Sequence, residues 1–167
     1  MQHWVDRQLK RIHKLERIFT VTAFVVMATA LIIDVVGREV FNHGFFGSVK
    51  FAVYILIYCA MAGFGIATAT GTHLRPKIAD NWFPTSWDRT IVRLGQWASA
   101  LLLLAICWAG VVFIESSMFL EERSETLDWL LWPFQLALPI GFGLSALRHL
   151  CFGIWPDLMP LAEGVSA

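Results

Sequence analysis

The residues of this sequence that could carry chemistry are few, and they stand at the ends of long apolar segments. Asp34 and Arg38 are four residues apart, with Glu39 beside them. On a helix this spacing puts a carboxylate and a guanidinium on one face, where pairing lowers the cost of desolvating both groups. His73 and His149 each follow another apolar segment, and histidines from two helices can ligate haem. A structural ion pair and a haem site are therefore the two chemistries to consider.

The two histidines carry the haem alternative, a four-helix membrane anchor of an electron-transfer complex. His73 is followed closely by Arg75, and His149 is preceded by Arg148. An arginine beside each histidine indicates the water boundary, whereas haem ligands usually lie inside a helix bundle. The pattern favours interfacial histidines over haem ligands.

The remaining residues do not indicate an enzyme. The sequence has no nucleophile–base pairing and no metal-ligand cluster, and no strand precedes the glycines at 63 and 65 to make a nucleotide loop. The cysteines lie in apolar segments at no metal or redox spacing; they are Cys59, Cys107 and Cys151. We predict a non-enzymatic protein without cofactor or metal.

The composition indicates an integral membrane protein. Hydrophobic residues make up 57% of the chain and charged residues only 16%, with a mean hydropathy of +0.61. Soluble domains carry about a quarter charged residues. Thirteen basic and thirteen acidic side chains cancel, so no basic excess points to nucleic acid as a partner.

Four uncharged segments can each cross a hydrocarbon core of about 30 Å, the first by continuing past Asp34 to the end of its helix. We expect spans at about 15–41, 48–72, 91–118 and 129–154, joined by connections too short to fold alone. The predicted fold is an all-α integral membrane bundle of four transmembrane helices, forming one domain over residues 1–167. In the fourth span Pro133 can begin the helix and Pro139 must bend it or locally loosen it.

Lysine and arginine indicate the orientation of the spans. Most lie before the first span, in the connection after the second, or beyond the fourth, which predicts that both termini are cytoplasmic. The third connection is acidic and is expected outside. Residues 28–30 (ATA) resemble a signal-peptide cleavage site, but the long basic region before the first span favours an uncleaved helix.

The N-terminal segment is amphipathic. Val5, Leu9, Ile12 and Phe19 fall on one side of a helix, and basic residues fall elsewhere. We expect an N-terminal amphipathic helix that either lies in the membrane interface or extends the first span inward.

The second span carries small residues every four positions. These form a stripe that would allow another helix to approach closely. They are Cys59, Gly63, Ala67 and Gly71. The stripe can pack within this chain or against a partner.

Three stretches of the sequence together carry the pattern of one family. Residues 37–41 (GREVF) stand at the end of the first expected span. The end of the second span has 63–65 (GFG), 71–74 (GTHL), Ile78 and 82–84 (WFP), and the entry to the fourth has 127–132 (LDWLLW) and 138–141 (LPIG). In this order they resemble the DctQ-like small membrane subunit of tripartite ATP-independent periplasmic (TRAP) transporters. Lys50 departs from the pattern, because relatives often carry an acidic residue there.

The resemblance implies a function that composition and spacing do not reach. Such a subunit is a static membrane scaffold in the bacterial inner membrane. It joins a large multi-span subunit that carries sodium and a carboxylate-type solute, and a periplasmic substrate-binding protein delivers the solute. A haem-bearing anchor and an unrelated four-helix assembly factor remain the alternatives.

On this resemblance the polar residues become candidate contacts with partners or structural pairs. At the outer end these are Asp34, Arg38 and Glu39, and at the cytoplasmic end His73 and Arg75. The acidic outer connection could dock the binding protein or remain a solvated loop. Its candidate residues are Glu121, Glu122 and Glu125.

Overall fold

The computed structural model describes residues 2–44, 46–70 and 88–159, and these residues are almost entirely helical. The elements are α1 (Gln2–Phe41), α2 (Ser48–Thr70), α3 (Asp88–Phe119), α4 (Trp132–Gln135), α5 (Ala137–Ile154) and the 3₁₀ turn η3 (Pro156–Leu158). Four helical segments of the described chain are long and apolar enough to cross a membrane, with α4 and α5 together forming the fourth. The predicted all-α membrane fold with four spans is confirmed.

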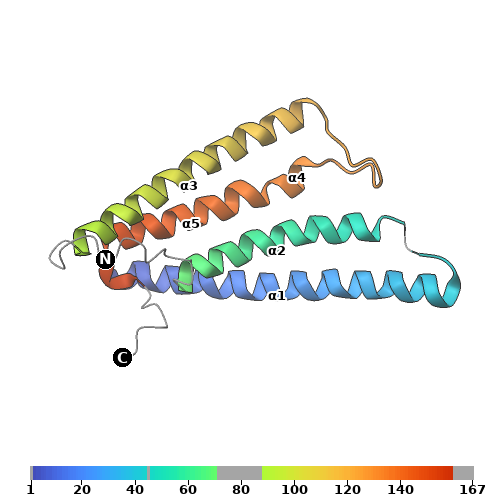
Figure 1. Cartoon of the computed structure of the whole chain (residues 1–167), viewed down its shortest axis with the longest axis horizontal. Coiled ribbons are helices and arrows are strands. Elements are labelled where there is room, and N and C mark those ends of the chain that lie inside the picture. Colours follow the sequence, from blue (N-terminus) through green and yellow to red (C-terminus); the bar gives the residue numbers. More distant parts are fainter. Residues whose placement is uncertain (1, 45, 71–87, 160–167) are drawn as a thin grey trace.

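The four spans lie side by side in the order α1, α2, α5, α3 (Figure 1). Two helical hairpins make up this row, α1 with α2 and α3 with α5, and the hairpins meet where α2 packs against α5. The fourth span is the most buried of the four and the first the least. The bundle is therefore open, and α1 and α3 form its two edges.

Helix α1 is one continuous helix of 40 residues. The amphipathic N-terminal segment extends the first span directly and forms no separate helix, which is the second of the two expected arrangements. At about 1.5 Å per residue the helix is roughly 60 Å long, about twice the thickness of a hydrocarbon core. A large part of its N-terminal half must therefore lie outside the hydrocarbon, or the helix must tilt strongly.

The fourth span is interrupted one turn before Pro139, where α4 ends at Gln135 and α5 begins at Ala137. Pro139 has no N–H to donate to the carbonyl of Gln135, and its ring crowds that carbonyl. Leu136, between the two segments, keeps helical angles (φ −56°, ψ −25°). Of the two expected effects of Pro139, the structure shows the local loosening, and the chain keeps its helical direction.

The fourth span begins at Trp132, with Pro133 in its first turn, rather than near residue 129. A short hairpin-like loop holds the preceding residues: Arg123 and Leu130 form an antiparallel bridge, and Ser124 N donates to Trp129 O at 2.8 Å. These backbone bonds keep Trp129 out of the helix, and Pro133 then starts it.

Close packing joins the two hairpins. A Cβ placed on Gly141 of α5 would lie 2.9 Å from Met61 Cβ of α2, so the missing side chain allows the backbones to approach. Nearer the start of α4, the rings of Tyr54 and Phe134 stack with centroids 4.4 Å apart. Tyr58 Oη also donates to Pro133 O at 2.6 Å. Small residues and aromatic contacts together fix α2 against the fourth span.

Candidate functional site

A buried ion pair between Glu16 of α1 and Arg148 of α5 is the most unusual polar feature of the described chain. Arg148 Nη2 lies 2.5 Å from Glu16 Oε2. Arg148 is 1% exposed and Glu16 8% exposed. Isolated charges in such surroundings would be very costly, so each group depends on the other for charge compensation.

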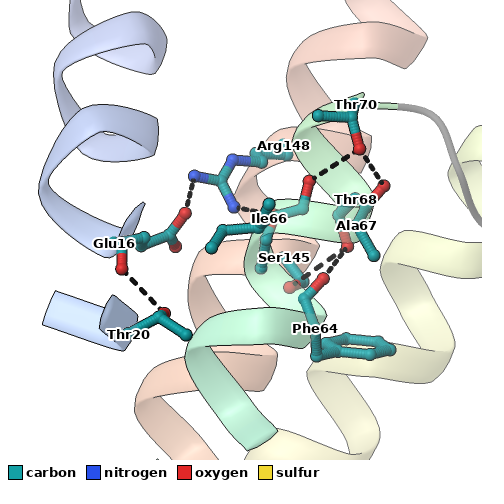
Figure 2. A network of polar contacts seen from close by, with 10 residues as sticks. Glu16, Thr20, Phe64, Ile66, Ala67, Thr68, Thr70, Ser145 and Arg148 are labelled. Atoms are coloured by element: carbon teal, nitrogen blue, oxygen red, sulfur yellow. Dashed lines mark hydrogen bonds and ion pairs between the residues drawn. The ribbon is translucent and has the colours of Figure 1, made fainter. Parts of the chain in front are cut away.

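Gly65 of α2 makes this pair possible. The two charged residues belong to helices on either side of α2, and Figure 2 shows Arg148 reaching across α2 toward Glu16. Arg148 Nη1 donates to Gly65 O at 2.6 Å. A Cβ on Gly65 would lie 2.5 Å from Glu16 Oε1 and 3.1 Å from Arg148 Nη1. The space that a side chain would fill is occupied by the ion pair.

Other polar contacts surround the pair on the same helices. Thr20 Oγ1 donates to Glu16 O at 2.8 Å. Ser145, one helical turn before Arg148, has its Oγ 3.4 Å from Thr68 Oγ1, and Thr68 Oγ1 lies 3.0 Å from Phe64 O (Figure 2). The arrangement ties three helices together at the end of the bundle that holds the start of α1.

The opposite end of α1 holds the predicted pair of Asp34 and Arg38. Arg38 Nη2 contacts Asp34 Oδ2, so the expected four-residue pairing is present. The Asp34 side chain is 3% exposed and that of Arg38 58%. A Cβ on Gly44 would lie 2.7 Å from Arg38 Nε, which shows that the chain folds back tightly over the pair. Glu39 is exposed beside it.

This end of α1 closes with residues outside the helical region of backbone angles. Asn42 has a positive φ of 52°, the left-handed conformation common just after a helix C-terminus. His43 N then donates to Gly37 O at 3.2 Å. Gly47, at φ 83°, completes the turn into α2. The ion pair of Asp34 and Arg38 thus lies where the α1–α2 hairpin closes.

The acidic connection between α3 and α4 divides into two kinds of side chain. Glu122 Oε2 accepts a hydrogen bond from Ser117 Oγ at 2.7 Å, which fixes it to the end of α3. Glu121 and Glu125 are exposed. Within the candidate docking set, these two are the residues available to a partner.

The residues of the small-residue stripe of α2 also differ in their surroundings. Cys59 is buried, with its Sγ 3.9 Å from Thr20 O of α1. A Cβ on Gly63 would meet nothing within 4 Å, and Ala67 is half-buried. Gly71 lies outside the described residues. Of the two described glycines of α2, only Gly65, off the predicted stripe, has neighbours that close. Packing of the stripe against a partner stays a prediction.

Of the two candidate haem ligands, only His149 falls within the described residues. Its Nδ1 lies 2.5 Å from Gln96 Oε1, so the ring links α5 to α3. His73 and Arg75 lie outside the described residues. Within the described ranges no group of three or more histidine, cysteine or acidic side chains could hold a metal ion. In the described chain, His149 thus contributes a contact between helices.

Comparison with known proteins agrees with this picture. Residues 15–154 match the family described as tripartite ATP-independent periplasmic transporters, DctQ component. The chain belongs to the DctQ family. It is also similar to the ectoine TRAP transporter small permease protein TeaB of Halomonas elongata. The two are 22% identical over 142 residues, which cover 83% of this chain and 72% of that protein. The suspected family is confirmed, and the chain is a membrane component of a transporter.

The reading from sequence missed both residues of the central ion pair in this DctQ-family chain. Glu16 is the only acidic residue between Asp6 and Asp34 and stands within a strongly basic segment. Arg148 follows Gly141 and Ser145 along one side of its span. A lone acid among cations and an arginine in line with small residues were the available signals. Neither identifies its partner, because 132 positions separate the two residues.

Proposed function

We propose that this chain is the non-catalytic small permease subunit of a TRAP transporter and acts as a static scaffold in the membrane. The large subunit would move solute and sodium against it. A periplasmic binding protein would deliver the solute, which we propose to be of carboxylate type. The membrane would be the bacterial inner membrane, with both termini cytoplasmic. Family membership supports the transporter role, and charge distribution supports the orientation.

The observation that carries the scaffold role is the ion pair of Glu16 and Arg148 with Gly65. A moving transport domain needs a partner that keeps its shape while the domain moves. A charge pair buried between helices opposes their separation, because parting the helices would leave two uncompensated charges in apolar surroundings. The ion pair therefore holds α1, α2 and α5 together, so that they move as one rigid unit.

The edges of the row suit the contact with the large subunit. On α1, Phe24 and Val25 are 57% and 55% exposed, and on α3 Leu101 and Trp108 are 74% and 72% exposed. Such side chains can pack against lipid or another membrane subunit. We propose that one of these edges faces the large subunit.

The experiment is affinity purification of the tagged chain from its native membranes in mild detergent. Mass spectrometry identifies co-purifying proteins, and a visible spectrum reports haem. We expect a large multi-span transporter subunit in stoichiometric amount. Recovery of redox subunits with a haem band, and no such transporter subunit, would contradict the proposal and return attention to His149.

The acidic loop gives a second test of this function. We expect Glu121→Gln with Glu125→Gln to weaken binding of the periplasmic protein at low salt. Two exposed ion pairs of about 0.5 kcal/mol each would raise Kd about fivefold. The effect should disappear at high salt, because exposed charges are screened. Binding to the reconstituted complex measures it.

A control for this test removes an exposed carboxylate at the same end of the bundle but outside the loop. Glu115→Gln makes this change and should leave the affinity for the periplasmic protein unchanged. Equal affinity of the loop variant and the parent complex at low salt would rule out docking through these residues.

A further inference from the structure

The N-terminal half of α1 carries a row of exposed cations. At about 100° per residue, these cations fall within about a third of the helix circumference, and Glu16 lies on the opposite side. All five are exposed; they are Arg7, Lys10, Arg11, Lys14 and Arg17. We call these five residues the cationic face.

The acidic side chains of this half of α1 neutralise only one residue of the cationic face, Lys10. Asp6 pairs with Lys10 at 2.7 Å. Glu16 points toward the other helices and forms its ion pair with Arg148. Arg7, Arg11, Lys14 and Arg17 form no ion pair with any residue that the structure describes. The inward pair thus leaves this half of α1 with a net positive face.

The cationic face continues without a break into an apolar strip. The positions that follow Arg7, Arg11 and Lys14 along the same side of the helix are Ile18, Val21 and Val25. Their side chains are 54%, 58% and 55% exposed. The helix therefore presents apolar groups and then cations along one line. A phospholipid offers the same order of chemistry, acyl chain and then phosphate.

The positions of the cations along the helix axis also agree with the position of the phosphates in a bilayer. Arg17 stands at the border of the apolar segment. Lys14 and Arg11 lie about 5 and 9 Å farther along the axis at 1.5 Å per residue. The polar headgroup layer on each side of a bilayer is about 5–8 Å thick. For an upright helix, Lys14 thus lies among the headgroups and Arg11 at their outer edge.

We propose that the cationic face and the apolar strip together bind anionic phospholipid. The lipid phosphate lies among Arg11, Lys14 and Arg17, and an acyl chain lies along Ile18, Val21 and Val25. Binding anchors the long first helix in the leaflet on the N-terminal side and sets its depth. This inference does not depend on the proposed transporter role, because the isolated chain carries the whole site.

The test counts lipids bound to the purified chain by native mass spectrometry. The probes are dioleoyl-phosphatidylglycerol and dioleoyl-phosphatidylcholine, which share acyl chains and differ in net charge. We expect the parent chain to prefer the anionic lipid. Arg11→Gln with Lys14→Gln and Arg17→Gln should lower the affinity for the anionic lipid by at least about tenfold. Binding of the zwitterionic lipid should hardly change.

The control variant removes three exposed cations elsewhere, Lys50→Gln with Arg93→Gln and Arg123→Gln. It should retain the preference for the anionic lipid. Both variants keep the buried ion pair, so equal thermal midpoints will show that each remains folded.

Several results would overturn the proposal. One is equal binding of the two lipids by the parent chain. Another is displacement of the anionic lipid by millimolar inorganic phosphate, which would indicate a site for free phosphate. A third is normal lipid binding by the Arg11, Lys14 and Arg17 variant combined with loss of the co-purifying large subunit. That result would assign the face to a protein interface.

Discussion

Arg148→Met should strongly destabilise the folded protein, because it leaves the Glu16 carboxylate unpaired in an apolar site beside the Gly65 carbonyl. Removing one partner of a buried pair costs about 3–5 kcal/mol, which corresponds to a fall in the thermal midpoint of roughly 10 °C for a chain of this size. The measurement is the fraction of monodisperse protein that survives heating in detergent. Glu16→Leu should be harmful for the converse reason, since Arg148 would keep only the Gly65 carbonyl.

The double variant, Glu16→Leu with Arg148→Met, distinguishes the effect of an unpaired charge on stability from the effect of a changed side-chain shape. It removes both buried charges, so we expect it to be more stable than either single variant. Lys10→Met is the matched control, because it breaks an exposed pair with Asp6 on the same helix; its midpoint should stay near that of the parent chain. If Glu16→Leu and Arg148→Met each had the same stability as the parent chain, the ion pair would not be what holds the helices together.

Gly65→Ala is expected to have the second largest effect. The new Cβ would lie 2.5 Å from Glu16 Oε1, and that carboxylate cannot move away without leaving Arg148. Overpacking of this kind costs about 1–3 kcal/mol. Thermal midpoints in detergent again report the change, together with the yield of co-purifying large subunit.

Gly63→Ala is the matched control two residues away. Its Cβ would meet nothing within 4 Å, so only the gain in helix propensity should remain, about 0.5–1 kcal/mol in favour of alanine. The penalty of Gly65→Ala should also shrink in a Glu16→Ala background, because the atom that clashes is then absent. Equal stability of the Gly65 and Gly63 variants would show that the space at Gly65 is not needed.

Local features of the sequence predicted much of the fold. Four apolar segments, each bounded by charge, predicted the four spans, and Pro139 predicted the loosening of the last. The four-residue spacing of Asp34 and Arg38 predicted their contact. These predictions succeeded because each depends on residues that are neighbours within one helix. The start of the fourth span was placed three residues early, because the bridge between Arg123 and Leu130 competes with the helix.

The central site could not be predicted in the same way. Glu16, Gly65 and Arg148 belong to three helices, and each has an ordinary role when read alone: a charge before a span, a small residue within one, a cation after one. Gly63 and Gly65 have the same side chain and similar neighbours in sequence, yet only Gly65 faces the ion pair. Which face of a helix meets which neighbour depends on the packing of the whole row.

By itself, the sequence determined that this chain spans a membrane four times, and its motifs pointed to the DctQ family. Hydrophobicity along the chain decides insertion because each span satisfies its own backbone hydrogen bonds in the bilayer. The tertiary structure alone decided the order of the helices, the burial of Glu16 against Arg148, and the outward direction of the remaining cations. These depend on contacts between distant segments, where one missing side chain at Gly65 lets two opposite charges meet.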